Sequence, residues 1–101
     1  MPEIRGNESI DILDVFHMGA KDVVLLQDNG GSGCPALLMF ATVDKASVVA
    51  SAEFGTCATA MRVLRSKDSI IVTQPLLYGH GSKRYVFHDG VVTEHGKAIK
   101  Q

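Results

Sequence analysis

The chain has 101 residues, of which 46% are hydrophobic and 21% are charged, and ten Lys and Arg oppose eleven Asp and Glu for a net charge of −1. A chain of this length forms one small domain with one modest core. We therefore expect a single domain over residues 1–101, with frayed ends at 1–7 and 97–101. The balanced charge argues against nucleic acid as a partner, because nucleic-acid-binding proteins gather positive charge to neutralise phosphates.

Membrane and export signals are weak in this sequence. The longest apolar run covers residues 36–41, far short of the roughly 20 residues that a membrane-spanning helix needs. The first eight residues include two glutamates and have no apolar stretch of the kind found in signal peptides. These features predict a cytoplasmic protein that has no membrane partner.

Residues 9–18 fit a short amphipathic helix that ends before Gly19, a residue suited to the left-handed position after a helix. Three apolar side chains would share one face of that helix: Ile12, Leu13 and Phe16. A strand that bends at Asp14 also fits this apolar spacing. The helix is the first interpretation, and the strand stays open as the alternative.

The next two elements predict a β-hairpin. Residues 22–27 contain the apolar run Val-Val-Leu-Leu, and residues 36–43 form a second apolar run that follows Pro35. The stretch between them, residues 28–33, is rich in glycine and in turn-forming side chains. We therefore expect two antiparallel strands joined by a long tip.

Residues 45–66 predict the main helix, because several alanines give this segment a high helix propensity. Apolar residues recur in it at spacings of three and four: Ala50, Phe54, Cys57, Met61 and Leu64. Gly55 lies near the middle and weakens the prediction. If residues 47–54 form a strand instead, the whole protein becomes all-β.

The C-terminal third predicts three more strands. Residues 68–73 contain a buried β-branched run, and Pro75 ends its pairing. The Asp89-Gly90 pair lies between apolar runs at 84–88 and 91–95, which is a strong signal for a tight hairpin. In that hairpin one face should enter the core, namely Tyr85, Phe87 and Val92.

Together these elements predict an α+β fold in the order α-β-β-α-β-β-β. Its five-stranded sheet is mostly antiparallel and carries one long and one short helix. An all-β fold is the alternative.

Candidate chemical groups are few. Cys34 is the candidate nucleophile, with a histidine such as His80 or His17 as base, although no sequence spacing supports either pairing. The glycine-rich tip offers backbone amides to an anion through Gly30, Gly31, Ser32 and Gly33. That tip joins two predicted strands, whereas phosphate loops lead from a strand into a helix. The two cysteines are not in a CxxC arrangement, and we expect ordinary thiols.

The C-terminal histidines raise the question of a metal site. In a two-residue hairpin at 89–90, His88 lies opposite Val91 and His95 lies opposite Arg84. Four strand residues then separate the histidines by roughly 13 Å, which is too far for one shared ion. We expect neither a metal nor a cofactor, and a metal site that the C-terminal histidines form with His80 or with a second subunit stays open as an alternative.

The central strands are apolar on consecutive residues, so both faces of the sheet require cover. Two helices of the expected lengths leave part of one face open, and exposed apolar patches are uncommon on monomers. We expect a homodimer that forms through the sheet, with four interface residues: Val24, Leu26, Leu37 and Met39. The predicted function is a non-catalytic protein-interaction or assembly module. The alternative is a small enzyme or ligand-binding protein whose site lies near Cys34, His80 and the loop 28–35.

Overall fold

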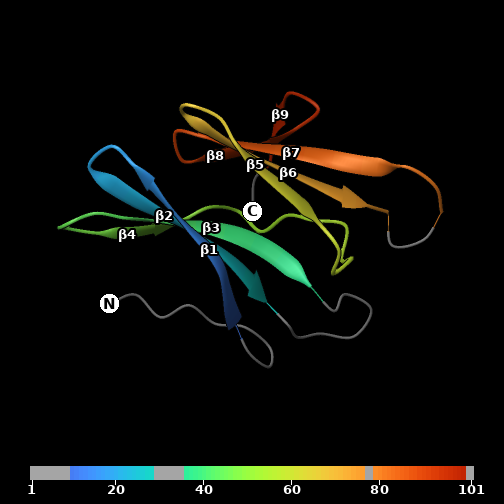
Figure 1. Ribbon diagram of the computed structural model, residues 1–101, viewed down its shortest axis with the longest axis horizontal. Coiled ribbons are helices and arrows are strands. Elements are labelled where there is room, and N and C mark those ends of the chain that lie inside the picture. The colour runs from blue at the N-terminus through green and yellow to red at the C-terminus, as the bar shows by residue number, and fades with distance from the viewer. Residues whose placement is uncertain (1–9, 29–35, 77–78, 100–101) are drawn as a thin grey trace.

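The computed structural model describes residues 10–28, 36–76 and 79–99, which form two antiparallel sheets stacked face to face (Figure 1). In each sheet every strand pairs with the next one along the chain. The first sheet contains β1 (Ile10–Met18), β2 (Lys21–Asp28), β3 (Leu37–Val43) and β4 (Val48–Ala50). The second sheet contains β5 (Arg62–Arg65), β6 (Ser69–Pro75), β7 (Ser82–His88), β8 (Val91–Glu94) and β9 (Lys97–Ala98).

The predicted α+β class is wrong, and the all-β alternative is correct for the described residues. Residues 10–18 form strand β1 instead of a helix. A helical stripe would bury Ile12 and Leu13 together with Phe16, but Ile12 is 68% exposed and Leu13 is 40% exposed. Gly19, with a φ of 68°, supplies the left-handed residue of a hairpin turn in place of a helix end. The register shift between Ile12 and Asp14 is a bulge at the predicted bend.

The predicted main helix at 45–66 is also wrong. This range contains the short strands β4 and β5, which are joined by an irregular stretch that we call the crossover segment, residues 51–61. Gly55 and Cys57 have φ values of 127° and 69°, which no right-handed helix accommodates. Phe54 instead exchanges backbone hydrogen bonds of 2.8 Å with Leu38 and lies in the core. Its tertiary contacts outweigh the helix propensity of the surrounding alanines.

The predicted hairpins are confirmed. Strands β2 and β3 pair antiparallel, and the connection between them falls largely outside the described residues. Strands β7 and β8 pair around Asp89 and Gly90, whose φ values of 51° and 82° fit the predicted tight turn. The expected inward face is also correct, because three side chains there are at most 3% exposed: Tyr85, Phe87 and Val92.

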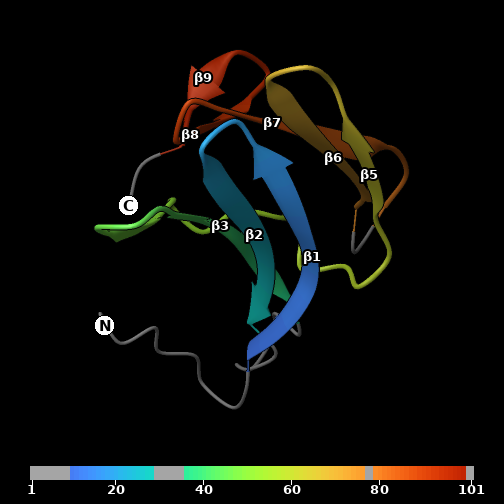
Figure 2. The same cartoon turned by 60° about the vertical axis from the view of Figure 1, so that its left-hand side comes forward.

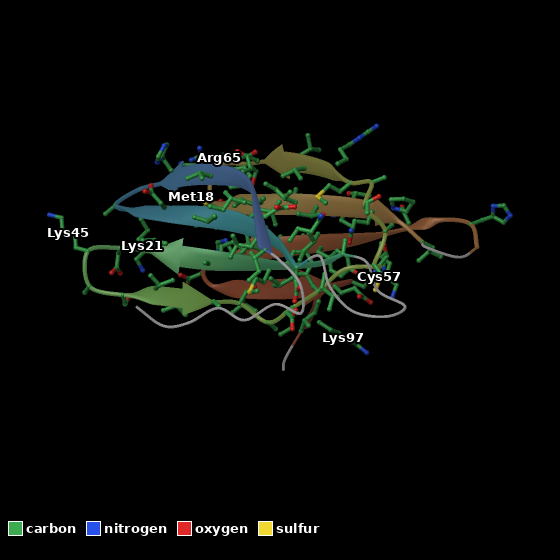
Figure 3. The ribbon with its side chains drawn as sticks, turned by 90° about the horizontal axis from the view of Figure 1, so that it is seen from below. Met18, Lys21, Lys45, Cys57, Arg65 and Lys97 are labelled. Carbon is green, nitrogen blue, oxygen red and sulfur yellow. The ribbon has the colours of Figure 1, made fainter. Side chains whose placement is uncertain are left out.

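The core lies between the two sheets, which Figure 2 shows from a second direction, and side chains fill the space between them (Figure 3). The ring centroids of Phe40 in the first sheet and Phe87 in the second are 4.5 Å apart. Phe54 of the crossover segment stacks on Phe40 at 5.5 Å and meets Tyr85 at 5.0 Å. We call these four residues the aromatic seam. Contacts of this kind add about 0.5–1.5 kcal/mol per pair beyond the burial of apolar area.

The first sheet is apolar on both faces, as its sequence predicts. Val23 and Leu25 face the second sheet within the main core. Leu26, the residue after Leu25, faces outward and belongs to a second cluster with Met39 and Ala41, which are also buried. Within the part of the chain that the structure describes, two-sided burial occurs without helices, because alternate residues of a strand enter different clusters.

Gln74 attaches the crossover segment to the second sheet. Its side chain is fully buried, and its Oε1 accepts a 3.1 Å hydrogen bond from the Thr56 amide. Its Nε2 donates a 2.9 Å bond to the carbonyl of Ala58. The arrangement requires glycine at position 55, because an added Cβ would lie 3.0 Å from Gln74 Oε1. One buried amide thus satisfies two backbone groups that the irregular segment cannot pair by itself.

We predict that Gln74→Leu lowers the free energy of unfolding by about 2 kcal/mol, since it leaves two backbone groups without their partner. Chemical denaturation monitored by circular dichroism measures this change. Glu53→Ala, an exposed change in the same segment, is the control. Equal stability of the two variants would contradict the role of Gln74.

Tyr85 predicts a stability loss at high pH. Burial, reinforced by the negative charge of Glu94, raises the pKa of the Tyr85 hydroxyl from 10.0 to about 12. The folded state holds this proton more tightly than the unfolded state. The contribution of the protonated Tyr85 hydroxyl to the free energy of unfolding is therefore complete below pH 10 and is lost as the pH rises towards 12. We expect Tyr85→Phe to reduce the slope of stability against pH in this window.

The same prediction has a direct spectroscopic test. The sequence contains two tyrosines and no tryptophan, so in Tyr78→Phe the ultraviolet absorbance of tyrosinate reports Tyr85 alone. We expect its titration midpoint to lie near 12 or to coincide with alkaline unfolding. A midpoint near 10 in the folded protein would contradict the buried hydroxyl.

Candidate functional site

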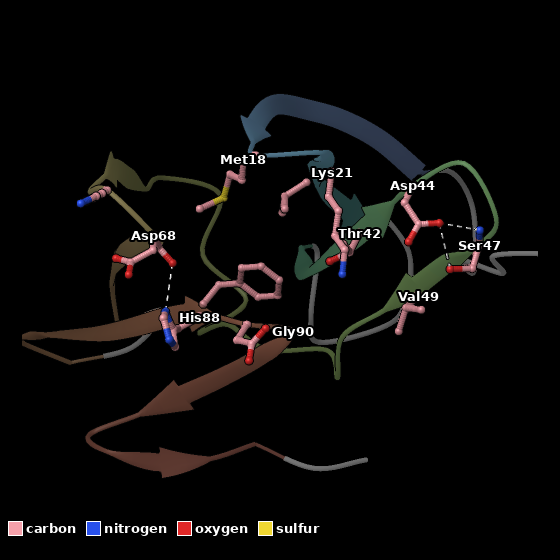
Figure 4. Close-up of a pocket in the computed structure, with 14 residues that line it drawn as sticks. Met18, Lys21, Thr42, Asp44, Ser47, Val49, Asp68, His88 and Gly90 are labelled. Atoms are coloured by element: carbon pink, nitrogen blue, oxygen red, sulfur yellow. Dashed lines mark hydrogen bonds between the residues drawn. The ribbon is translucent and has the colours of Figure 1, made fainter.

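A cleft of about 670 Å³ opens at one end of the sandwich (Figure 4). Four hairpin turns of the described residues lie at this end, two from each sheet, and all four contribute to the cleft. They are residues 19–20, 44–47, 66–68 and 89–90. In an antiparallel meander every second connection falls at the same end, and here the two sheets bring such ends together. We call this space the turn-end cleft.

The first sheet supplies one wall. Met18 and Lys21 flank the turn between β1 and β2, whereas Asp44 lies in the turn after β3. Thr42 and Val49 line the same wall from β3 and β4. In Figure 4 the Lys21 side chain extends into the space between the walls. This wall therefore combines apolar contact surface with charges of both signs.

The Asp44 carboxylate is fixed by its own turn. Its Oδ1 accepts hydrogen bonds from the amides of Ala46 at 2.8 Å and Ser47 at 2.9 Å. These backbone bonds lower the pKa of Asp44, and the positive charge of Lys21 adds to the effect. The Asp44 carboxylate is therefore a fixed negative charge on the first wall, and the positive charge of Lys21 partly compensates it.

The second sheet supplies the facing wall. Lys67 and Asp68 come from the turn between β5 and β6, and His88 and Asp89 come from the end of β7. Phe87, a residue of the aromatic seam that is 3% exposed, lines the floor of the cleft. Carboxylates exceed ammonium groups on this wall by one.

His88 is oriented by the backbone of the neighbouring turn. Its Nδ1 lies 3.0 Å from the carbonyl oxygen of Asp68 and 3.3 Å from Ser69 Oγ. A carbonyl can only accept a hydrogen bond, so Nδ1 carries the proton. In the neutral ring Nε2 is then the atom that can accept a hydrogen bond from a ligand.

Of the predicted catalytic pair Cys34 and His80, only His80 falls within the described residues, and it is exposed and does not line the turn-end cleft. Gly30, Gly31, Ser32, Gly33 and Cys34 lie outside the described residues. The described strand ends that border the two predicted site loops, at the pairs Asp28–Leu37 and Pro75–Ser82, lie at the opposite end of their ladders from the cleft.

The expectation of two ordinary thiols is wrong, because Cys57 is disulfide-bonded. It is also only partly buried, so it is not the core residue that a helical stripe implied. Figure 3 places Cys57 at the end away from Met18 and Lys21. The sulfur of Cys57 is therefore not available as a thiol nucleophile.

The described residues contain no group of three or more His, Cys, Asp and Glu side chains that could hold a metal ion. The predicted pairing of His88 with Val91 is correct. His95 follows the end of β8 and lines a separate small cavity with Arg84. The two histidines therefore face different spaces.

All four predicted interface residues share the outer face of the first sheet, as the pairs Leu26–Met39 and Asp28–Leu37 require. However, Leu26 and Met39 are only 6% and 7% exposed in the single chain. The exposed apolar surface of that face lies instead on β1, at Ile12 and at Val15, which is 45% exposed. Sequence reasoning missed this strip because it placed residues 9–18 in a helix.

The turn-end cleft was not predicted either. The turn signals themselves, such as Asp44 and the Asp89-Gly90 pair, are visible in the sequence. Only the all-β alternative places alternate turns of two meanders at one end, and that topology would have drawn attention to the charged residues beside them.

The described residues contain no helix long and apolar enough to cross a membrane. No protein-family model, curated protein or solved structure matches this chain.

Proposed function

We propose that the protein is a ligand-binding module whose site is the turn-end cleft. The observation that supports this proposal best is the cleft volume of about 670 Å³. Small-molecule sites typically enclose about 300–1,000 Å³, with an apolar lining and a few convergent polar groups. Here Val23 and Phe87 provide apolar floor, and charged side chains from the turns surround it.

Binding fits the hydrogen bonds of the cleft better than covalent catalysis does. A nucleophilic hydroxyl needs a base within hydrogen-bond reach. Ser47 Oγ donates to Asp44 Oδ1 at 3.3 Å, but backbone hydrogen bonds lower the pKa of that carboxylate and make it a weak base, and His88 Nδ1 is engaged with the carbonyl of Asp68. Both side chains are thus held as recognition groups on a rigid framework.

A fragment screen by nuclear magnetic resonance tests this proposal. We expect fragments that bind to shift the backbone amide resonances of Lys21, Asp68 and Gly90, which line the cleft, and to leave Ser82 at the opposite end unchanged. Val49→Trp should weaken binding by filling the cleft. Leu64→Trp, an equally exposed apolar position outside it, is the control. Shifts confined to other regions, or equal affinity in both variants, would contradict the assignment.

Self-association is the second candidate function, and the exposed strip of β1 favours it. Ile12, Leu13 and Val15 are large apolar residues that a monomer leaves in water. Strand β1 is an edge of the first sheet, but its bulge and the carboxylate of Asp14 oppose pairing through the edge itself. A homodimer would therefore use the outer face, extending over Val24 and Leu37.

We predict that sedimentation velocity over a range of concentrations detects a dimer. The double change Ile12→Ser and Val15→Thr should shift the protein to monomer, because it removes the exposed apolar contact surface. Val91→Thr, at an exposed apolar position in the second sheet, should leave the dimer intact. A wild-type protein that stays monomeric at every concentration would contradict this second candidate.

The cytoplasmic location expected from the sequence stays a prediction. The disulfide at Cys57 weighs against it, because disulfides persist mainly in oxidising compartments.

A further inference from the structure

The two walls of the turn-end cleft carry charges of both signs. Lys21 and Asp44 lie on the first-sheet wall, and Lys67, Asp68 and Asp89 lie on the second-sheet wall. Surfaces that recognise polyanions or polycations present a single sign of charge. A mixed set over an apolar floor complements a small molecule that itself carries both charges.

The first wall presents an ammonium group to a ligand. Asp44 is already engaged by its turn through two backbone amides and the Ser47 hydroxyl. Lys21, by contrast, influences Asp44 only through its charge and extends into the space between the walls (Figure 4). A ligand carboxylate that enters the cleft would meet Lys21 as its nearest flexible donor on this side.

The second wall favours a cation. Its carboxylates, Asp68 and Asp89, outnumber its single ammonium group, Lys67. His88 adds no positive charge while its ring is neutral, and its Nε2 can then accept a hydrogen bond. A ligand ammonium group would therefore be drawn to this side.

We infer that the cleft binds small zwitterions with an apolar body, of the amino-acid or short-peptide class; this rests on the proposed ligand-binding function. The carboxylate faces Lys21, the ammonium group faces Asp89, and the apolar body lies over Val23 and Phe87. The two charges set the orientation, and the floor supplies apolar contact.

Calorimetric titration with the tripeptide alanyl-leucyl-alanine tests the inference. The peptide is used with free termini, with an acetylated N-terminus and with an amidated C-terminus. We expect the free peptide to bind most tightly and each blocked form to bind about threefold to fivefold more weakly, as is typical of partly exposed charge pairs.

Two variants assign each terminus to its wall. Lys21→Met should bind the free and amidated peptides equally, and Asp89→Asn should bind the free and acetylated peptides equally. Asn is compatible with the φ of 51° at position 89, so the turn should persist. Lys97→Met and Asp14→Asn, at exposed charges outside the cleft, should keep the preference for free termini.

Blocked peptides that bind as tightly as the free peptide would overturn the zwitterion assignment, as would variants that keep the wild-type preferences. Absence of tripeptide binding would also overturn it. If fragments still shift the cleft resonances in that case, the ligand class is wrong while the ligand-binding function stands. If neither fragments nor tripeptide bind, both proposals fail.

Discussion

The contact between the apolar inner faces of two meandering sheets is the interaction on which the rest of this structure depends. A small antiparallel sheet is stable in water only when a hydrophobic face is covered. The aromatic seam provides that cover: Phe40 and Phe87 come from different sheets, and Phe54 extends the contact along the core. Because Phe54 belongs to an irregular segment, the buried amide of Gln74 becomes necessary to pair that segment's backbone. The buried hydrogen bonds of Gln74 are thus a consequence of the burial of Phe54 in the aromatic seam.

The cleft follows from the same packing. The seam ends at Phe87, one residue before His88, and beyond that point the hairpin turns replace apolar side chains with charged ones. The space between the sheets therefore changes from closed core to open cleft at the C-terminal end of β7, between Phe87 and the turn that follows His88. Asp44 is held by hydrogen bonds within its own turn, and His88 is held by the Asp68 carbonyl of the neighbouring turn. Such local bonds orient the charged rim before any ligand arrives.

Sequence reasoning recovered the parts of the fold that depend on local signals. The hairpin around Asp89-Gly90 and the pairing of β2 with β3 have turn residues between apolar runs, and both are correct. The segments around Phe16 and Phe54 were misassigned because an apolar spacing of three or four fits a helix, and only contacts with distant strands decide against it. The error then hid the site, since the cleft exists only where two all-β meanders bring their turns together. The exposed apolar residues of β1 were hidden for the same reason.

The division between seam and turns separates what keeps the protein folded from what it recognises. The seam residues occupy strands and the crossover segment, whereas nearly all the charges of the cleft rim stand in or beside short exposed turns. Surface turns tolerate altered length and composition far better than packed strands do. Descendants of this chain could therefore acquire new specificities by exchanging a few turn residues, while the buried framework passes unchanged from one variant to the next.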